Sequence, residues 1–358
     1  MESFAFVIHP LDVKDVARKF PFTRFLPARV VEGALKFLPA MKVAHITGVR
    51  SAYAETEGWF VSCPLTARQI MNLPADYVLK KLVRAGRLAE ELGAKILGLG
   101  AFTKVFGDAG VSLAKNLRIP VTTGNSYTVA TAVEGTREAA RLMGHDLRGA
   151  AVAVVGATGA IGGVCAELLS REARELTLVG RNLQKLEMLA DRILYRTGLA
   201  AKISTDIKKT LRGADIVITV TSAVDTVIEP EDLKPGAVVC DVARPRDVSR
   251  RVATERPDVL VIEGGVVAVP GDVKFNLDFG FPPKTAYACM AETMVLALER
   301  RYESFTLGRE LTTEKVEEIA ALAQKHGFKL AGFRSFEKAL DAAAIERVKE
   351  AARQKNRT

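Results

Sequence analysis

The chain has 358 residues, of which 48% are apolar and 26% charged, and it carries a formal net charge of +9. This length and composition predict a globular protein with room for two domains, and the lack of a signal peptide and of about eighteen consecutive apolar residues argues against secretion and membrane insertion. The basic residues are spread along the chain without interleaved aromatics, which argues against nucleic-acid binding but favours an acidic partner through long-range attraction.

Strands and helices alternate in the first part of the chain and predict a small α/β domain. The expected strands are Phe4–Ile8, Lys42–Thr47, Gly58–Ser62, Lys95–Gly100 and Ile119–Val121. The expected helices are residues 12–19, with Asp12 as the cap, 76–92 and 128–143. A loop rich in Pro and Phe follows the first helix, and a polar turn, Thr122–Tyr127, precedes the last.

A second series of strands begins after the composition changes at Gly144–Gly149. Its members are Ala151–Val155, Glu175–Val179, Ala201–Ser204, Ile216–Thr219, Ala237–Val242 and Val259–Glu263. Because helices separate them, we expect a doubly wound parallel sheet of the Rossmann type. Residues 285–301, 313–326 and 336–358 predict helices that complete the first domain. The predicted domains are an N-terminal substrate domain (1–145), a Rossmann domain (146–284) and C-terminal helices packing on the first domain (285–358).

The stretch Ala151–Gly163, AVAVVGATGAIGG, joins a buried strand, a glycine turn and the start of a helix. Small residues there let the backbone approach a pyrophosphate, whose charge is met by free N–H groups and by the helix dipole. The alternative is a turn kept only for close packing of strand and helix. The predicted contacts to the dinucleotide come from Gly156, Thr158, Gly159, Ala160, Ile161 and Gly162.

Two further segments of the predicted Rossmann domain concern the cofactor. Arg181 follows the second strand, where an NAD site would carry an acidic residue for the ribose hydroxyls. A guanidinium suits a 2′-phosphate, which predicts NADPH, although a surface arginine could also stand there. Thr221 and Ser222 follow the fourth strand, where a nicotinamide ribose commonly passes.

The four cysteines, Cys63, Cys165, Cys240 and Cys289, show neither zinc-ligand nor disulfide spacing, so we expect no metal site and a reducing cytoplasmic setting. Cys289 lies near the start of the helix that leaves the Rossmann domain. A helix N-terminus stabilises a thiolate, so Cys289 is either a nucleophile or a small packing residue. Cys165 and Cys240 are expected to pack, and Cys63 is open to either interpretation.

Other residues capable of proton transfer carry weaker signals. His9 ends a strand and could donate a proton, but no base–nucleophile pattern accompanies it or the other histidines. Tyr77 and Lys81 have the spacing found in short-chain dehydrogenases. They precede the glycine turn, which is the wrong order, so we interpret them as part of an amphipathic helix.

Several blocks of sequence resemble one family in the same order along the chain. They are GAFTKVF at Gly100, TTGNSYT at Thr122, VAVVGATGAIG at Val152, GGVV at Gly264, AYACMAETMVLALE at Ala286, FTLGRELTTEKVEEI at Phe305 and KHGF at Lys325. Together they resemble the long-chain fatty acyl-[acyl-carrier-protein] reductases of the cyanobacterial type, from about Phe4 to Phe328.

The resemblance implies an enzyme that uses NADPH to reduce a fatty acyl thioester to a fatty aldehyde. In that family the cysteine of the ACxAE block accepts the acyl group, and the matching residue is Cys289. Our candidates for stabilising the oxyanion are Asn125, Ser126 and Tyr127 on the polar turn. The donor would be an acidic acyl carrier protein or acyl-CoA, and an enzyme that consumes the aldehyde is a possible partner.

The chain departs from the family pattern at several points. Tyr127 stands where the family typically has histidine, Ala160 replaces an acidic residue, and Pro270–Lys284 differs in sequence and length. The tail beyond Phe336 extends past the usual end. Two other functions stay open: a dehydrogenase of the shikimate or quinate type, which would need a lysine and an acidic partner, and an NADPH-binding sensor in which Cys289 only packs.

Overall fold

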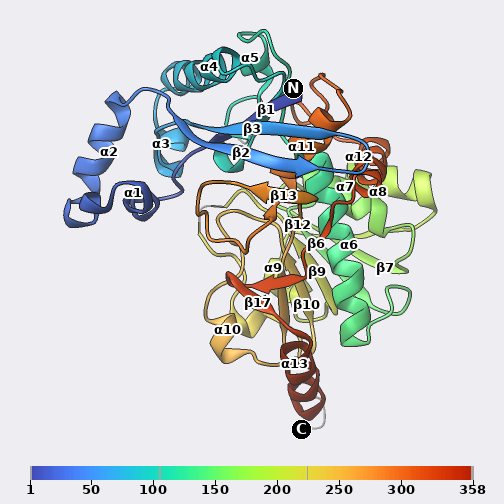
Figure 1. Ribbon diagram of the computed structural model, residues 1–358. Coiled ribbons are helices and arrows are strands. Elements are labelled where there is room, and N and C mark those ends of the chain that lie inside the picture. Colours follow the sequence, from blue (N-terminus) through green and yellow to red (C-terminus); the bar gives the residue numbers. More distant parts are fainter. Residues whose placement is uncertain (1, 105, 224, 356–358) are drawn as a thin grey trace. The chain divides into compact units, whose positions relative to one another are not determined.

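Two six-stranded sheets, each with its own helices, organise the chain in the computed structural model, which describes residues 2–104, 106–223 and 225–355 (Figure 1). The first unit consists of Met1–Gly124, Ala268–Glu310 and Ala321–Lys329. The second consists of Asn125–Val267, Leu311–Ala320 and Leu330–Thr358. Neither unit is continuous in sequence, because the chain passes between them repeatedly. The expected α/β fold class, with a doubly wound Rossmann-type sheet and a second α/β domain, is confirmed.

The sheet of the first unit has the strand order β13-β2-β3-β1-β4-β5. Its strands are β1 (Glu2–Ile8), β2 (Lys42–Arg50), β3 (Glu55–Ser62), β4 (Leu97–Leu99), β5 (Val121–Thr122) and β13 (Gly271–Lys274). β1 pairs in parallel with β3 and β4, and β4 pairs in parallel with β5. β2 is antiparallel to β3, and β13 is antiparallel to β2. The four parallel strands therefore share one carboxyl edge.

Alternating side chains of β1 fill the two faces of this sheet. Ala5 and Val7 point to the cluster that includes Val78 and Leu82 of α4 (Ala75–Glu91). The next residues, Phe4 and Phe6, occupy the other face because successive strand residues point to opposite sides. The other face is covered by α11 (Ala288–Leu298), which packs against β1 and β4. Figure 1 shows α4 and α11 on opposite sides of β1 and β3.

An arm of short helices precedes β2 in the first unit. It contains α1 (Val13–Lys19), η1 (Pro21–Phe25) and α2 (Ala28–Phe37), and α3 (Ala67–Asn72) follows β3. The expected cap of the first helix is confirmed, because the Asp12 side chain accepts from the backbone N–H of Lys14. The prediction of a loop after that helix is wrong, since most of this segment forms η1 and α2. Pro21 and Pro27 made the segment look like a loop in the sequence, although proline is tolerated at a helix start.

The side chains of Tyr77 and Lys81 hold the end of α2. The Tyr77 hydroxyl donates to the carbonyl of Lys36 at 2.5 Å, and the Lys81 ammonium donates to that of Leu38 at 2.7 Å. The last carbonyls of a helix have no partners within it, so both contacts satisfy acceptors that would otherwise lack one. The interpretation of this pair as structural rather than catalytic agrees with these contacts.

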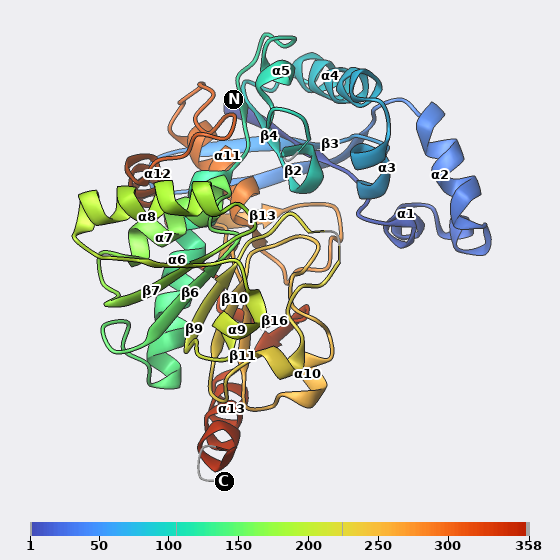
Figure 2. The same ribbon diagram turned by 180° about the vertical axis from the view of Figure 1, so that it is seen from behind.

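The sheet of the second unit is entirely parallel, with the order β11-β10-β9-β6-β7-β8 (Figure 2). Its strands are β6 (Ala151–Val155), β7 (Glu175–Val179), β8 (Lys202–Ser204), β9 (Ile216–Thr219), β10 (Val238–Asp241) and β11 (Leu260–Glu263). Numbered from the first strand, the order is 3-2-1-4-5-6, that of dinucleotide-binding folds. The order reverses direction between β6 and β9, where ligands bind in such sheets.

Helices cover both faces of this sheet because the strand residues alternate. Val152 and Val154 of β6 join a cluster with α6 (Asn125–Met143), α7 (Ala160–Leu169) and α8 (Leu183–Thr197). Ala153 and Val155 join the opposite cluster with α9 (Ile207–Leu211) and α10 (Val252–Glu255). Strands buried on both sides read as continuous apolar runs, which is why they were recognisable in the sequence.

The compact units differ from the predicted domains. α6 was expected in the N-terminal domain, but Val129, Ala132 and Val133 fill the core of the second unit. The tail was expected as one helix packing on the first domain. Instead β16 (Phe333–Ser335) and β17 (Lys338–Leu340) form a hairpin, and α13 (Ala342–Lys355) joins the second unit. Phe336 and Glu337 both have positive φ, as a two-residue hairpin turn requires.

The remaining elements are short or lie at the joins between the segments of the two units. They are η2 (Ala101–Lys104), α5 (Val111–Ala114), η3 (Pro230–Asp232), β12 (Val266–Ala268), β14 (Thr285–Tyr287), α12 (Thr313–Lys325) and β15 (Lys329–Leu330). Within the described ranges, no helix combines the length and apolar character needed to cross a lipid bilayer.

His9 fixes the carboxyl end of β1. Its Nδ1 lies 3.0 Å from the carbonyl oxygen of Pro10, and its Nε2 accepts from the backbone N–H of Phe102 at 3.2 Å. Both contacts suit a neutral ring with its proton on Nδ1. Burial lowers the pKa of His9 to about 4. The proposal that His9 donates a proton is therefore disfavoured near neutral pH, and its role is structural.

We expect His9 to make folding stability depend on pH. Between pH 6.5 and about 4 the unfolded chain binds a proton at His9 that the folded chain does not. The free energy of unfolding should fall as the pH drops through this window, and less steeply in His9→Gln, which has no such proton. Denaturant unfolding at several pH values measures this. Parallel curves for the two proteins would contradict the assignment.

Candidate active site

Cys289 lies in the first turn of α11, at the carboxyl edge of the parallel strands of the first unit. Tyr287, with an extended backbone, caps the helix. Gly124, two residues beyond the end of β5, touches Cys289. Further along α11, Thr293 lies against Gly98 of β4. The helix therefore starts at the carboxyl edge and runs back across the sheet, which places Cys289 where parallel α/β sheets carry their sites.

The contact between Gly124 and Cys289 admits no side chain on the glycine. A Cβ at Gly124 would lie 2.3 Å from the Cα and 2.4 Å from the Cβ of Cys289. Gly124 also has φ +70°, in the left-handed region that favours glycine. The backbone of the TTGN turn thus runs directly beside the cysteine. The turn is conspicuous in the sequence, but no local pattern assigns this role to its glycine.

The environment of the Cys289 thiol contains opposing influences. Its side chain is almost buried, and this burial raises the pKa of the thiol above its ordinary value. The charge of Lys104, at the end of η2, and the backbone N–H groups of Met290 and Cys289 lower that pKa, whereas the Glu292 carboxylate raises it. The neutral thiol of Cys289 therefore dominates at neutral pH. The Lys104 charge and the two backbone N–H groups would stabilise its thiolate when it forms.

A fully buried carboxylate fixes the elements around Cys289. Glu292 Oε1 accepts hydrogen bonds from the hydroxyls of Thr122 at 2.6 Å and Thr306 at 2.8 Å. The backbone N–H of Thr306 donates to the Thr122 hydroxyl, and that of Thr123 donates to the Thr306 carbonyl at 2.8 Å. Glu292 follows Cys289 by three residues, so the network holds the end of β5 to the helix face that carries the cysteine. In the sequence, the signal that marks this carboxylate is the ACMAE block, of which Glu292 is the last residue.

A series of aromatic rings leads to the residue that caps α11. Phe60 of β3 contacts Phe275 and Phe279, with ring centroids 6.2 and 5.9 Å apart. Phe279 contacts Phe281 at 5.4 Å, and Phe281 contacts Tyr287 at 4.4 Å. Three of these rings belong to Pro270–Lys284, the segment that departs from the family pattern. An apolar wall therefore ends two residues before Cys289.

Asn125, Ser126 and Tyr127, the predicted oxyanion residues, belong to the second unit. They form the first turn of α6 rather than the expected polar turn, since α6 begins at Asn125. All three are buried, and burial raises the pKa of Tyr127. Asn125 Oδ1 has no hydrogen-bond partner among the described residues. Their catalytic role stays a prediction.

The glycine turn of the second unit forms a close-fitting loop at the point where the sheet order reverses. A Cβ at Gly156 would lie 2.7 Å from the carbonyl oxygen of Val220, just after β9. A Cβ at Gly162 would lie 2.3 Å from the carbonyl oxygen of Gly156. Gly159 caps α7 without a side chain, and Ala160 and Ile161 form its first turn. Their N–H groups have no acceptors within the helix, as a phosphate site requires.

Arg181 and Thr158 lie where an adenosine ribose would be expected. The Thr158 side chain is close to Gly180, whose Cβ would come within 3.2 Å of it. Arg181 is exposed directly after Gly180 and forms no ion pair with any described residue. A guanidinium free at the end of the second strand fits a 2′-phosphate.

The predicted contact residues after β9 have different surroundings. The Thr221 hydroxyl donates to Asp247 at 2.5 Å and accepts from the N–H of Ala223 at 3.1 Å. Asp247 also accepts from the Thr219 hydroxyl and the Thr221 N–H, at 2.6 and 2.8 Å. Thr221 thus shapes the loop, while Ser222 is exposed. Asp247 is fully buried and was missed, because only the fold brings it to β9.

The other cysteines do not share the features of Cys289. Burial raises the pKa of Cys63 and of Cys240 to about 12, and that of Cys165 is raised as well. Their thiols are therefore inert, as expected for Cys165 and Cys240. Within the described part of the chain, no three His, Cys, Asp or Glu residues form a group that could hold a metal ion.

The parallel sheet, its glycine turn and the switch point define an NAD(P)-binding protein of the reductase type. Residues 137–263 match the family described as shikimate / quinate 5-dehydrogenase. The second unit is an NADP-binding domain of that type, and its glycine cradle and free Arg181 fit NADPH, the cofactor. The match lies within the nucleotide-binding unit.

Two curated relatives cover most of the chain. The long-chain acyl-[acyl-carrier-protein] reductase of Synechococcus elongatus is 31% identical over 88% of this chain and 94% of its own length. The aminotransferase PigE of Serratia sp. is 32% identical over 87% of this chain, which spans 36% of the length of PigE. The chain belongs to the reductase family that includes the Synechococcus enzyme.

Solved structures show more distant likeness. A dipicolinate synthase protein of Bacillus halodurans has 17% identity and a TM-score of 0.34, over 54% of this chain and 62% of that one. The nucleotide-binding domain of glutamyl-tRNA reductase from Thermoplasma volcanium has 20% identity and a TM-score of 0.28, over 37% and 84%.

We expect Gly124→Ala to disturb the site through its contact with Cys289. The added methyl group combines backbone strain with overlap, which should lower the free energy of unfolding by about 3 kcal/mol. Gly93→Ala is the matched control, because Gly93 has φ +83° but open space around its Cβ. It should cost about 1 kcal/mol from strain alone. Equal losses in denaturant unfolding would contradict a steric role for Gly124.

We expect Arg181→Gln to weaken NADPH binding about tenfold and to leave NADH binding unchanged, since a charge-assisted bond to the 2′-phosphate is lost. Fluorescence titration with each nucleotide measures both affinities. Arg212→Gln is the control, because Arg212 caps the C-terminal end of α9, at the opposite edge of the sheet. Equal weakening of both nucleotides by Arg181→Gln would count against the assignment.

Proposed function

We propose that the protein reduces a fatty acyl thioester to a fatty aldehyde with NADPH, through an acyl group carried on Cys289. The observation that carries the proposal is the position of Cys289, in the first turn of α11 beside the backbone of Gly124. Membership of the reductase family supports the same chemistry. The wall of Phe and Tyr rings that ends next to the cysteine suits a long apolar acyl chain.

In the first step the Cys289 thiolate attacks the thioester carbonyl carbon. A new carbon–sulfur bond forms, the bond to the donor's sulfur breaks, and the donor leaves as a thiolate that takes up a proton in place of the one that the Cys289 thiol gave up. The N–H groups of Met290 and Cys289 and the charge of Lys104 favour the attacking anion. Burial keeps the thiol neutral until then, which protects it from other electrophiles.

NADPH, when bound, would supply the hydride for the second step, in which the Cys289 thioester would take up hydride and one proton and be released as aldehyde and cysteine thiol. The chain's own contribution is to hold the acyl carbon still. Glu292 ties the end of β5 to α11, so the Gly124 backbone and the cysteine keep one geometry in both steps. Asn125, Ser126 and Tyr127 are our candidates for polarising the carbonyl.

The acyl donor in this proposal is an acidic acyl carrier protein or acyl-CoA. The net charge of +9 supports either donor through long-range attraction. A released long-chain aldehyde is reactive and sparingly soluble in water. We therefore also propose that a second enzyme consumes the released aldehyde in the next reaction.

The test is to trap the acyl enzyme. Incubation with acyl-CoA or acyl carrier protein without NADPH should add one acyl mass to the protein, and NADPH should remove it as aldehyde. Intact mass spectrometry follows both events, and a series of chain lengths identifies the preferred substrate. Cys289→Ala should abolish the adduct and reduce aldehyde formation more than a thousandfold, the scale of losing a covalent nucleophile.

Cys63→Ala is the matched control, since Cys63 is also buried in the first unit. It should keep the adduct. An adduct that persists in Cys289→Ala, or none at any chain length, would refute the proposal. In the second case NADPH binding without acylation would favour the sensor.

A further inference from the structure

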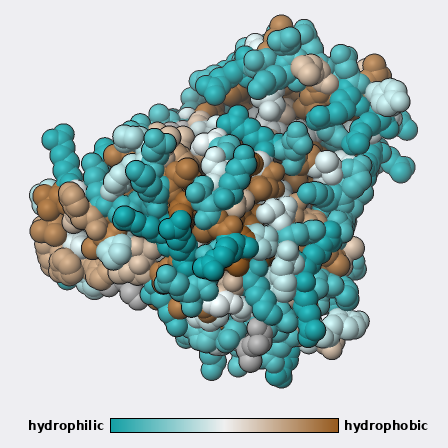
Figure 3. Space-filling view, turned by 90° about the horizontal axis from the view of Figure 1, so that it is seen from above, coloured by the Kyte–Doolittle hydropathy of each residue, from teal (hydrophilic) through white to brown (hydrophobic). Residues whose placement is uncertain are grey.

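Two elements of the arm that precedes β2, η1 and α2, expose large apolar side chains to solvent and are named the η1–α2 arm. Phe22 is 63% exposed, Phe25 75%, Val30 53% and Phe37 88%. Folded proteins seldom display several such side chains within one short segment, and a cluster of them marks an interaction surface. Figure 3 shows apolar residues gathered at the left end of the molecule, where Figure 1 places α1 and α2.

α2 presents three faces with different chemistry. Val31 and Leu35 are buried and pack with Val16 of α1. On a second face, Val30 and Phe37 are exposed, at positions that lie together on a helix. On the third face, between the other two, lie Arg29, Glu32 and Lys36, spaced three and four residues apart.

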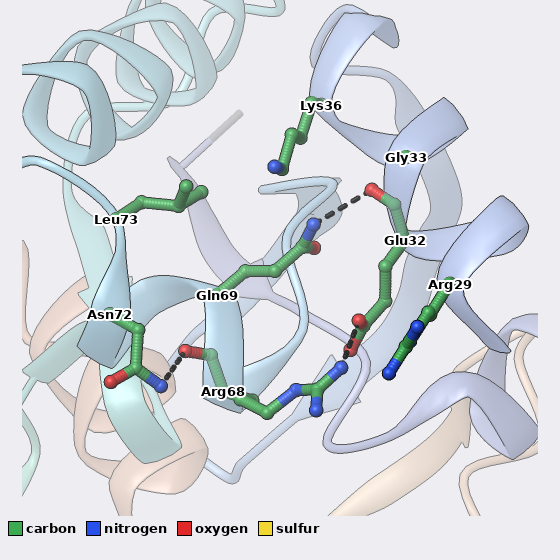
Figure 4. A pocket seen from close by; sticks show the side chains of 8 residues that line it. All are labelled: Arg29, Glu32, Gly33, Lys36, Arg68, Gln69, Asn72 and Leu73. Carbon is green, nitrogen blue, oxygen red and sulfur yellow. Dashed lines mark hydrogen bonds and ion pairs between the residues drawn. The ribbon is translucent and has the colours of Figure 1, made fainter.

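The third face borders a pocket of about 450 Å³ between α2 and α3 (Figure 4). Arg68 of α3 reaches across it to the carboxylate of Glu32, which neutralises the acidic residue. Arg29 and Lys36 also line the pocket, and neither forms an ion pair with a residue that the structure describes. The pocket therefore carries two uncompensated positive charges beside the apolar face.

Contacts at the middle and at the C-terminal end of α2 hold it in this orientation. The Gln69 amide donates to the carbonyl of Glu32 at 2.7 Å, and the Thr66 hydroxyl donates to its carboxylate. Tyr77 and Lys81 hold the carbonyls at the other end. Phe37, the last residue of α2, is thus held outward by a braced helix rather than free to fold into the core.

We propose that the η1–α2 arm docks on the surface of a bilayer that contains anionic phospholipid. Phe22, Phe25, Val30 and Phe37 enter the boundary between headgroups and acyl chains. Arg24, Arg29 and Lys36 remain at the level of the phosphates, with the pocket beside α2 open to a headgroup. Apolar rings flanked by basic residues are the pattern of interfacial helices.

Charge and shape favour a membrane over a protein partner. The exposed rings come from two consecutive elements, and the Arg24 guanidinium lies over the Phe25 ring, 4.6 Å from its centroid. Aromatic rings placed next to cations suit the boundary between lipid headgroups and acyl chains. An acidic carrier protein would be met by the basic face alone and would leave these rings in water. The inference goes beyond the proposed function, and it does not depend on thioester chemistry at Cys289.

Sedimentation with lipid vesicles tests the proposal. The full chain should bind vesicles of phosphatidylcholine with phosphatidylglycerol, and bind vesicles of phosphatidylcholine alone at least tenfold more weakly. Phe25→Ser with Phe37→Ser should weaken binding about tenfold by removing buried rings. Arg29→Gln with Lys36→Gln should weaken it about fivefold for each charge removed.

The matched control is Met188→Ser with Tyr195→Ser on α8, since these side chains are 66% and 93% exposed. It should bind as the wild type does, and circular dichroism checks that every variant is folded. Cys289→Ala should also bind, so failure of the acyl chemistry leaves this test intact. Absence of vesicle binding, or equal weakening by the α8 variant, would overturn the proposal. So would loss of a dimer, or of carrier-protein binding, in the Phe variant with unchanged vesicle binding.

Discussion

The buried carboxylate of Glu292 is the constraint on which the first unit's site depends. Removing a carboxylate from water costs several kcal/mol unless hydrogen bonds replace its hydration. Two threonine hydroxyls supply such bonds here, one from the end of β5 and one from the segment after α11. The need of the Glu292 carboxylate for hydrogen-bond donors therefore fixes three segments relative to one another: the end of β5, α11 and the segment after α11. Cys289 lies one helical turn from Glu292, so its position is fixed as well.

The two units solve the same physical problem in the same way. At the carboxyl edge of a parallel sheet the backbone must turn sharply, and its amides become available to a ligand. In the second unit Gly156 and Gly162 let the loop approach β9 and α7, as a pyrophosphate requires. In the first unit Gly124 lets the loop after β5 approach Cys289. At the carboxyl edge of each sheet, the absence of a glycine side chain allows close backbone contact where a larger residue would not fit.

Sequence patterns predicted the strands of the second unit well, because strands buried on both faces are continuous apolar runs. They also predicted the glycine turn that joins β6 to α7, whereas the roles of Arg181 and Cys289 stay predictions. They failed where local signals conflicted with packing. Prolines concealed η1 and α2, polar residues concealed the first turn of α6, and two non-glycine residues with positive φ made the hairpin before α13 invisible. Asp247 was missed because its partners on β9 are distant in sequence.

The sequence by itself determined the cofactor-binding fold, since this depends on short-range order: strand, glycine turn, helix start. Only the tertiary structure decided which helices belong to which unit, since an apolar helix face in the sequence does not indicate the sheet against which it packs. It also decided that Glu292 holds the turn beside Cys289 in place, and that α2 carries Phe37 exposed to solvent. Those facts depend on contacts between segments far apart in the chain, where hydrogen bonds must be satisfied in three dimensions.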